Sequence, residues 1–154
     1  MIETATRRWA TIVTVIKVLM VAEAISFLLA ALLHTGIQFL PGFTEPRNTI
    51  AAIVEGLCGI FLTVSVYAVF ARKTWGWRVA VAAHVFALAA VLVGITVIAL
   101  GRNPGGDEAN NIFHRVILVV LVVVLARLLT PRARALVGRS NQALHSNRHY
   151  TYKE

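Results

Sequence analysis

The sequence is poor in cysteine and in charge, and each scarcity excludes a class of protein. Cys58 is the only cysteine among 154 residues, so neither a disulfide scaffold nor a cysteine-based zinc or iron–sulfur site can form within one chain. Charged residues make up only 14% of the chain, against roughly 25% in an average soluble domain. The motifs G-x-x-x-x-G-K-[ST], G-x-G-x-x-G and H-E-x-x-H do not occur, so the sequence does not indicate the P-loop, dinucleotide-binding or metalloprotease sites that these motifs form.

Apolar residues take the place of the missing charges. They form 58% of the chain, above the roughly 45–50% of a soluble domain. A helix needs about 20 mainly apolar residues to cross the hydrocarbon layer of a membrane, and too little polar sequence remains here to coat a soluble helical core. We therefore expect an all-α, four-helix transmembrane bundle over residues 1–130, followed by a disordered or peripheral basic tail, 131–154. The expected spans lie at about 12–33, 50–70, 77–100 and 112–129.

The net charge of +8 is distributed unevenly along the chain. Basic residues concentrate in the N-terminal segment, in the connection between the second and third spans, and in the tail, whereas the other two connections hold few. Because basic residues favour the cytoplasmic side, we expect a multi-pass protein of the cell membrane, in a bacterium the inner membrane, with both termini cytoplasmic. The charge is then mainly an orientation signal, and we expect no nucleic-acid partner. The residues that give this signal are Arg7, Arg8, Arg72, Lys73, Arg78, Arg132, Arg134, Arg139, Arg148 and Lys153.

The tail follows the fourth span directly, and Pro131 is expected to end that helix. Basic residues just beyond a span, such as Arg132 and Arg134, attract anionic lipids by about 1 kcal/mol each. We therefore expect the tail to contact the lipid bilayer through its anionic head groups. His145 and His149 have a spacing that could bind metal only in a helix, and the surrounding sequence has poor helix signals.

Ionisable residues inside the spans are costly, at roughly 2.5–3.5 kcal/mol each on insertion scales, so each needs a partner or a role. Glu23 lies near the middle of the first span, too deep to reach the head groups. His84, at a similar depth on the third span, is its nearest candidate partner. We expect a buried Glu23–His84 pair, here called the inner pair, which serves either as a structural hydrogen bond or as part of a proton relay.

A second polar group lies nearer the outer side. His34 ends the first span, Glu55 lies about one and a half turns below the outer end of the second, and His114 begins the fourth. These three residues, here called the outer cluster, therefore share a depth on three helices. Such a set suits a divalent metal, a haem held by both histidines, or a quinone or lipid head group. Alternatively, the two histidines only cap helix ends in contact with water, and Glu55 forms a hydrogen bond to a neighbouring helix.

Arg115 follows His114 and is basic on the outer side, against the orientation rule. We therefore include Arg115 among the candidate ligand-binding residues, for an anionic head group or a substrate carboxylate. Its nearest neutralising partners in the sequence are Asp107 and Glu108, with Glu55 on another helix.

Three short segments carry a family resemblance: Ala30–His34, Ile53–Gly56 and Ile112–His114. With them the membrane portion resembles small four-helix bacterial membrane proteins of the DoxX-like or uncharacterised families. The resemblance implies a compact bundle, sometimes close to redox functions, and it singles out the same outer cluster.

Three functions fit these observations. The first is a membrane-complex subunit or small-ligand binder, alone, as a homo-oligomer or within a larger assembly. The second is a redox protein that binds haem or a metal through the outer cluster. The third is a proton-coupled small transporter that uses the inner pair and Glu55. Whether the chain is an enzyme is left open by the sequence.

Overall fold

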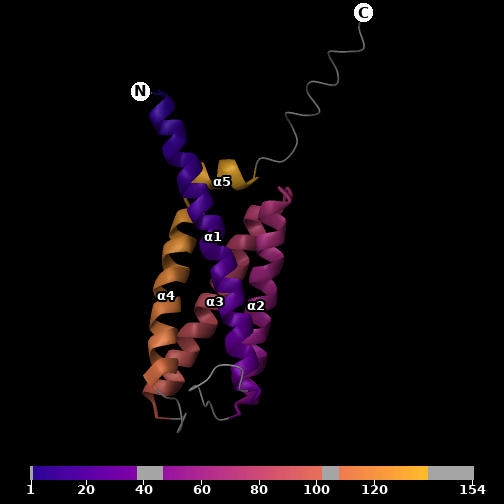
Figure 1. Cartoon of the computed structure of the whole chain (residues 1–154), viewed down its shortest axis with the longest axis vertical. Coiled ribbons are helices and arrows are strands. Elements are labelled where there is room, and N and C mark those ends of the chain that lie inside the picture. The colour runs from indigo at the N-terminus through magenta and orange to yellow at the C-terminus, as the bar shows by residue number, and fades with distance from the viewer. Residues whose placement is uncertain (1, 38–46, 102–107, 139–154) are drawn as a thin grey trace, which may run out of the picture.

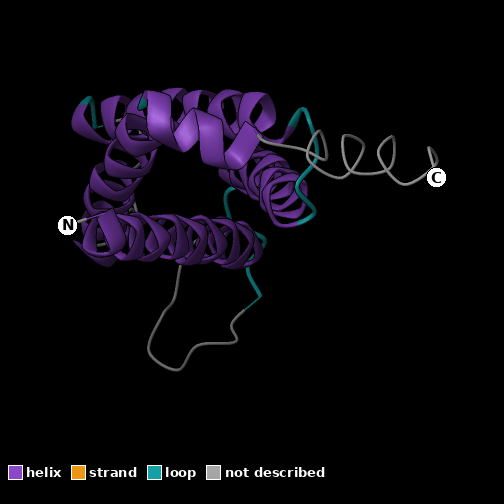
Figure 2. Ribbon diagram, turned by 90° about the horizontal axis from the view of Figure 1, so that it is seen from above, coloured by secondary structure: helices purple, strands orange, loops and turns teal. Residues whose placement is uncertain are grey.

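The computed structural model describes residues 2–37, 47–101 and 108–138, and every regular element in these ranges is a helix (Figures 1 and 2). Within them, four stretches are long and apolar enough to cross a membrane: Thr11–His34, Thr49–Phe70, Gly76–Ala99 and Asn110–Leu128. The protein is therefore an all-helical, multi-pass membrane protein. The helices are α1 (Ile2–His34), α2 (Thr49–Phe70), α3 (Gly76–Ala99), α4 (Glu108–Leu128) and α5 (Pro131–Gly138).

The four long helices follow the expected spans, and the largest difference lies at the start of the chain. α1 begins at Ile2, ten residues before the expected span, because no glycine or proline interrupts the segment that precedes the apolar run. Helix length here is set by backbone propensity, whereas the span is set by apolar side chains alone. α4 likewise begins at Glu108, before its first long apolar residues.

The long helices pack in chain order, α1 on α2, α2 on α3 and α3 on α4, and α5 lies across one end of the bundle (Figure 1). We call the end with α5 the inner end and the end with His34 the outer end, after the orientation expected from the sequence. α3 starts behind α2 at the inner end and runs diagonally to finish beside α4. At the outer end the bundle is therefore divided into two pairs of helices, α1 with α2 and α3 with α4.

Close packing of α1 on α2 depends on one glycine. A Cβ added at Gly59 would lie 2.7 Å from Leu28 Cδ2 and 3.1 Å from the Leu28 backbone nitrogen, so only glycine permits this approach. The apolar core lies on the facing sides of the helices. Its largest fully buried apolar side chains are Met20, Phe27, Leu62, Leu121 and Leu128.

The start of the tail is a helix rather than an irregular segment. Pro131 occupies the first position of α5, where its missing N–H costs nothing, and the Thr130 hydroxyl accepts a hydrogen bond from the Ala133 backbone N–H at 3.3 Å. Ala133 and Val137 are buried, so α5 packs one side onto the bundle. Pro131 thus separates two helices, and its role as a helix start explains α5. The metal-binding spacing of His145 and His149 lies outside the described residues.

Candidate functional site

The structure brings the two residues of the inner pair together. Glu23 Oε2 lies 2.9 Å from His84 Nε2, and the two side chains are 1% and 0% exposed. His84 Nδ1 donates to the Ala80 carbonyl at 2.6 Å, because a carbonyl can only accept. The 2.9 Å separation is that of a hydrogen bond, so Glu23 Oε2 and His84 Nε2 are joined directly.

The surroundings of the inner pair are apolar and tightly packed. Ala24 and Ala83, each next to one member of the pair, belong to the same buried core as Phe27 and Leu62. Among the described residues, Glu23 Oε1 has no hydrogen-bond partner, which leaves one buried acceptor of the pair unused. The pair is thus a closed polar contact in the core.

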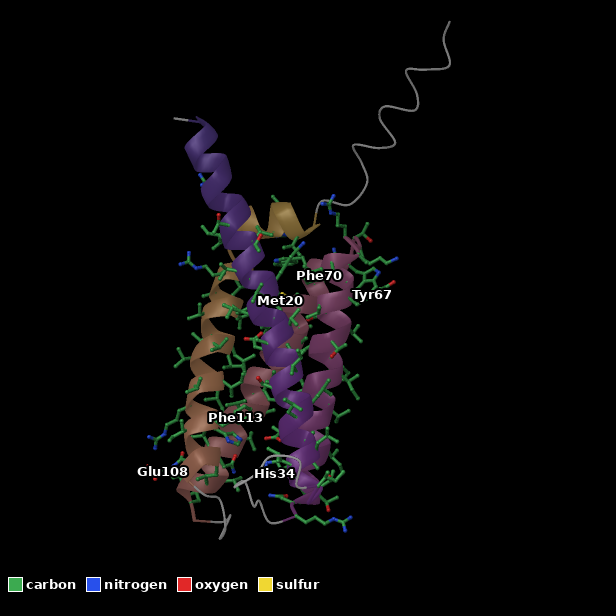
Figure 3. The ribbon with its side chains drawn as sticks, viewed as in Figure 1. Met20, His34, Tyr67, Phe70, Glu108 and Phe113 are labelled. Carbon is green, nitrogen blue, oxygen red and sulfur yellow. The ribbon has the colours of Figure 1, made fainter. Side chains whose placement is uncertain are left out.

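The outer cluster also comes together, but with longer distances. Glu55 Oε2 lies 3.5 Å from His34 Nε2, and Glu55 Oε1 lies 3.8 Å from His114 Nε2. All three residues are buried, with 4% of His34, 6% of Glu55 and 8% of His114 exposed. Each carboxylate oxygen therefore faces a different imidazole, and the three side chains come from α1, α2 and α4. Figure 3 shows His34 at the same end as Glu108, away from Met20.

Backbone contacts fix how the two histidines are presented. His114 Nδ1 donates to the Asn110 carbonyl at 2.9 Å, so Nε2 is the atom turned towards Glu55. A Cβ added at Gly94 would lie 3.2 Å from this Nε2, so the absence of a side chain on α3 makes room for the imidazole. The His34 carbonyl accepts from the Asn48 N–H at 2.9 Å, which ties the end of α1 to the start of α2.

The distances decide what the outer cluster can do chemically. Both exceed the roughly 2.7–3.2 Å of a good N–H···O hydrogen bond, and Glu55 Oε2 has no hydrogen-bond partner among the described residues. When His114 is neutral, its Nε2 is an acceptor, because Nδ1 carries the hydrogen. Two buried acceptors from different helices therefore face the same space, an arrangement that favours a group that donates hydrogen bonds.

That space is a cavity of about 360 Å³ between the two pairs of helices. Its volume falls within the roughly 300–1,000 Å³ of ligand pockets, which are mostly apolar with a few placed polar groups. One part of the cavity wall carries the outer cluster with Asn48 and Asn110. Cys58, one helical turn from Glu55, also lines this part. The remaining wall is apolar, formed by Phe27, Ile50, Ala51, Val54, Ala90, Val91, Val93, Gly94, Val97 and Ile98.

The other predicted ligand features stand apart from this cavity. Arg115 is exposed and is not among the residues that line it, so its role in ligand binding stays a prediction. In the parts of the chain that the structure describes, no group of three or more His, Cys, Asp or Glu residues is arranged to hold a metal ion. Binding of a metal or haem by the outer cluster also stays a prediction.

Sequence reasoning missed several residues of the cavity. Asn110 precedes His114 by one turn, so its place on the same face could have been read from helical spacing. Asn48 was recognisable as a helix N-cap, and its Oδ1 accepts from the Ala51 N–H at 3.1 Å. The sequence did not indicate Gly94, because the role of this glycine depends on its contact with His114 of another helix.

Comparisons with protein-family models, with curated proteins and with solved structures found no match to the chain. The resemblance to DoxX-like proteins therefore rests on the three short segments alone, and the function has to be argued from the site.

Proposed function

We propose that the protein binds a small, mostly apolar molecule in the outer cavity and holds it by a group that donates hydrogen bonds. The observation that carries this proposal is the buried Glu55 carboxylate, which has an oxygen without a hydrogen-bond partner among the described residues and lines a cavity of about 360 Å³. A buried polar group that lacks a partner costs about 1–3 kcal/mol. A ligand that supplies the missing donor recovers this free energy, which gives the site a reason to bind.

The polar groups indicate the chemistry of the bound head. Glu55 is an acceptor when ionised, and neutral His114 offers the lone pair of Nε2 from the other pair of helices. A hydroxyl or a phenol can donate to either group, and a hydroquinone carries two such hydroxyls. The apolar wall then holds the ring through residues such as Val54 and Val91. We therefore name the ligand class as a phenol or alcohol with an apolar body.

The membrane orientation belongs to the same proposal, with both termini on the cytoplasmic side of the cell membrane. Exposed basic residues at the inner end support it, because such residues favour the cytoplasmic side and attract anionic lipids. Lys17 fits the same picture, with its Nζ 4.9 Å from the centre of the Phe70 ring near that end. A reporter fused after Glu154 and active only outside the cytoplasm would contradict it. The exposed residues are Arg72, Lys73, Arg78, Arg127, Arg132 and Arg134.

Equilibrium binding to the protein in lipid nanodiscs tests the function. The ligand is tritiated decylhydroquinone, and the change is Gly94→Val, which puts a side chain where a Cβ alone would lie 3.2 Å from His114 Nε2. We expect saturable binding to the unmodified protein and loss of at least about tenfold in affinity in the variant, since the added methyl groups fill the site.

Ala89→Val is the matched control, because Ala89 is an exposed residue of the same helix outside the cavity lining. Equal affinity in all three proteins, or no saturable binding to the unmodified protein, would overturn the proposal. Metal analysis and an absorption spectrum of the same sample test the alternative functions, and a stoichiometric metal or a Soret band would support them instead.

A further inference from the structure

The two helices that contribute most of the cavity wall, α2 and α3, diverge from the inner end outwards. They are joined there by a short turn, where a Cβ added at Gly76 would lie 2.9 Å from the Ala68 carbonyl oxygen. Nearer the middle, the Phe61 and Phe86 rings meet edge to face with their centres 5.1 Å apart. Beyond these rings α3 leaves α2 and finishes beside α4 (Figure 1). The cavity lies in the space between the outer parts of α2 and α3.

The exposure of the lining residues shows on which side the cavity reaches the surface. α1 and α4 contribute Phe27, His34, Asn110 and His114, and all four are buried. α2 and α3, in contrast, contribute lining residues that are also exposed: Ile50 at 77%, Val93 at 64% and Val97 at 38%. The cavity therefore opens sideways between α2 and α3.

We expect this side opening to face hydrocarbon. Ile50, Val93 and Val97 lie on helices long and apolar enough to span a membrane, and exposed aliphatic side chains of such helices contact lipid tails. A molecule that passes between them must already be dissolved in the bilayer. Its polar group meets Glu55 and His114 only after it has moved inwards.

The size of the cavity limits how much of such a molecule fits inside. About 360 Å³ is a little more than twice the roughly 150 Å³ that suffices to hold a benzene ring. A ring or head with a few carbons fills it, and a longer chain has to continue outwards past Val93 and Ile50.

We infer that the ligand is a single-chain lipid, which enters from the bilayer between α2 and α3 and keeps its chain in that opening while its hydroxylated head contacts Glu55. This inference rests on the proposed function and adds the route by which the ligand enters and the place of its hydrocarbon chain. Val97→Trp narrows the opening, since Val97 both lines the cavity and is exposed. Val85→Trp is the control, because Val85 is an exposed valine of the same helix about three turns away and outside the lining.

Association rates of decylhydroquinone and of hydroquinone without a chain are measured in nanodiscs, with concentrations corrected for partition into the lipid. We expect Val97→Trp to slow association of the decyl compound at least about tenfold, while Val85→Trp leaves the rate unchanged. We also expect the unmodified protein to bind the decyl compound at least about tenfold more tightly than the compound without a chain. Equal rates in both tryptophan variants, with binding to the unmodified protein intact, would overturn the route but not the function.

A measurement on the unmodified protein keeps the inference testable if Val97→Trp does not fold. A diazirine placed on the chain of the hydroquinone is activated by light, and the labelled peptides are identified. We expect label on the segments that contain Ile50 and Val93. Label confined to α1 or α4 would contradict the opening between α2 and α3, and absence of any saturable label would count against the proposed function itself.

Discussion

The inner pair and the outer cluster place similar residues at two depths of one bundle, and they differ in the distance between carboxylate and imidazole and in the space beside them. Glu23 and His84 are joined at 2.9 Å, within reach of a good hydrogen bond, and are enclosed by the core. Glu55 lies 3.5 and 3.8 Å from its two histidines, beside a cavity. Under the proposed function, the carboxylate that is closed on its partner serves packing, and the carboxylate that lies farther from its partners serves binding.

The difference has a cause in the way the helices are arranged. Near the middle of the bundle, α1 and α3 are close enough for the Glu23 carboxylate to meet the His84 imidazole directly. At the outer end the pairs α1–α2 and α3–α4 separate, so Glu55 stays 3.8 Å from His114 across the cavity, while His34 lies 3.5 Å from it within the α1–α2 pair. The inner pair should therefore govern stability, and the outer cluster should govern binding.

The largest expected effect is on binding, from Glu55→Leu. The change removes the carboxylate acceptor, and a hydrogen bond to a charged group is worth about 1.5–3 kcal/mol, so affinity for decylhydroquinone should fall about 10- to 100-fold. The free energy of unfolding should hold or rise, because a buried polar group without a partner is replaced by an apolar one. Glu55→Gln, which keeps one acceptor oxygen, should lose less affinity. An unchanged affinity in Glu55→Leu would contradict the claim that the outer cluster, unlike the inner pair, governs binding.

A smaller effect, on stability, is expected from Glu23→Leu. The change leaves His84 Nε2 buried without its partner, which should lower the free energy of unfolding in mixed micelles by about 1–3 kcal/mol. Adding His84→Leu should restore most of that loss, because both partners are then apolar. Affinity for decylhydroquinone should stay within about twofold in the variants, since neither residue lines the cavity. A loss of affinity without a loss of stability would place the inner pair in the function.

Much of the architecture could be predicted from the sequence, because apolar run length and the rise of a helix fix spans and depths. The same arithmetic put His84 about one turn from Glu23 in depth, and it put Glu55, His34 and His114 within about a turn or two of one another. It could not decide which way each side chain points around its helix or which helices separate. The cavity therefore escaped prediction, as did the contact of Gly94 with His114, because both arise only when helices pack. α5 was missed for a different reason: Pro131 was taken as the end of one helix, although it also suits the start of the next.

The most direct measurement compares the affinity of the unmodified protein for decylhydroquinone with that for its dimethyl ether. The two compounds share ring and chain, but only the hydroquinone can donate hydrogen bonds to Glu55 and His114. The hydroquinone should bind about 10- to 100-fold more tightly, and this preference should disappear in Glu55→Leu. Equal affinity of the unmodified protein for the two compounds would contradict recognition of a hydrogen-bond donor by the outer cluster.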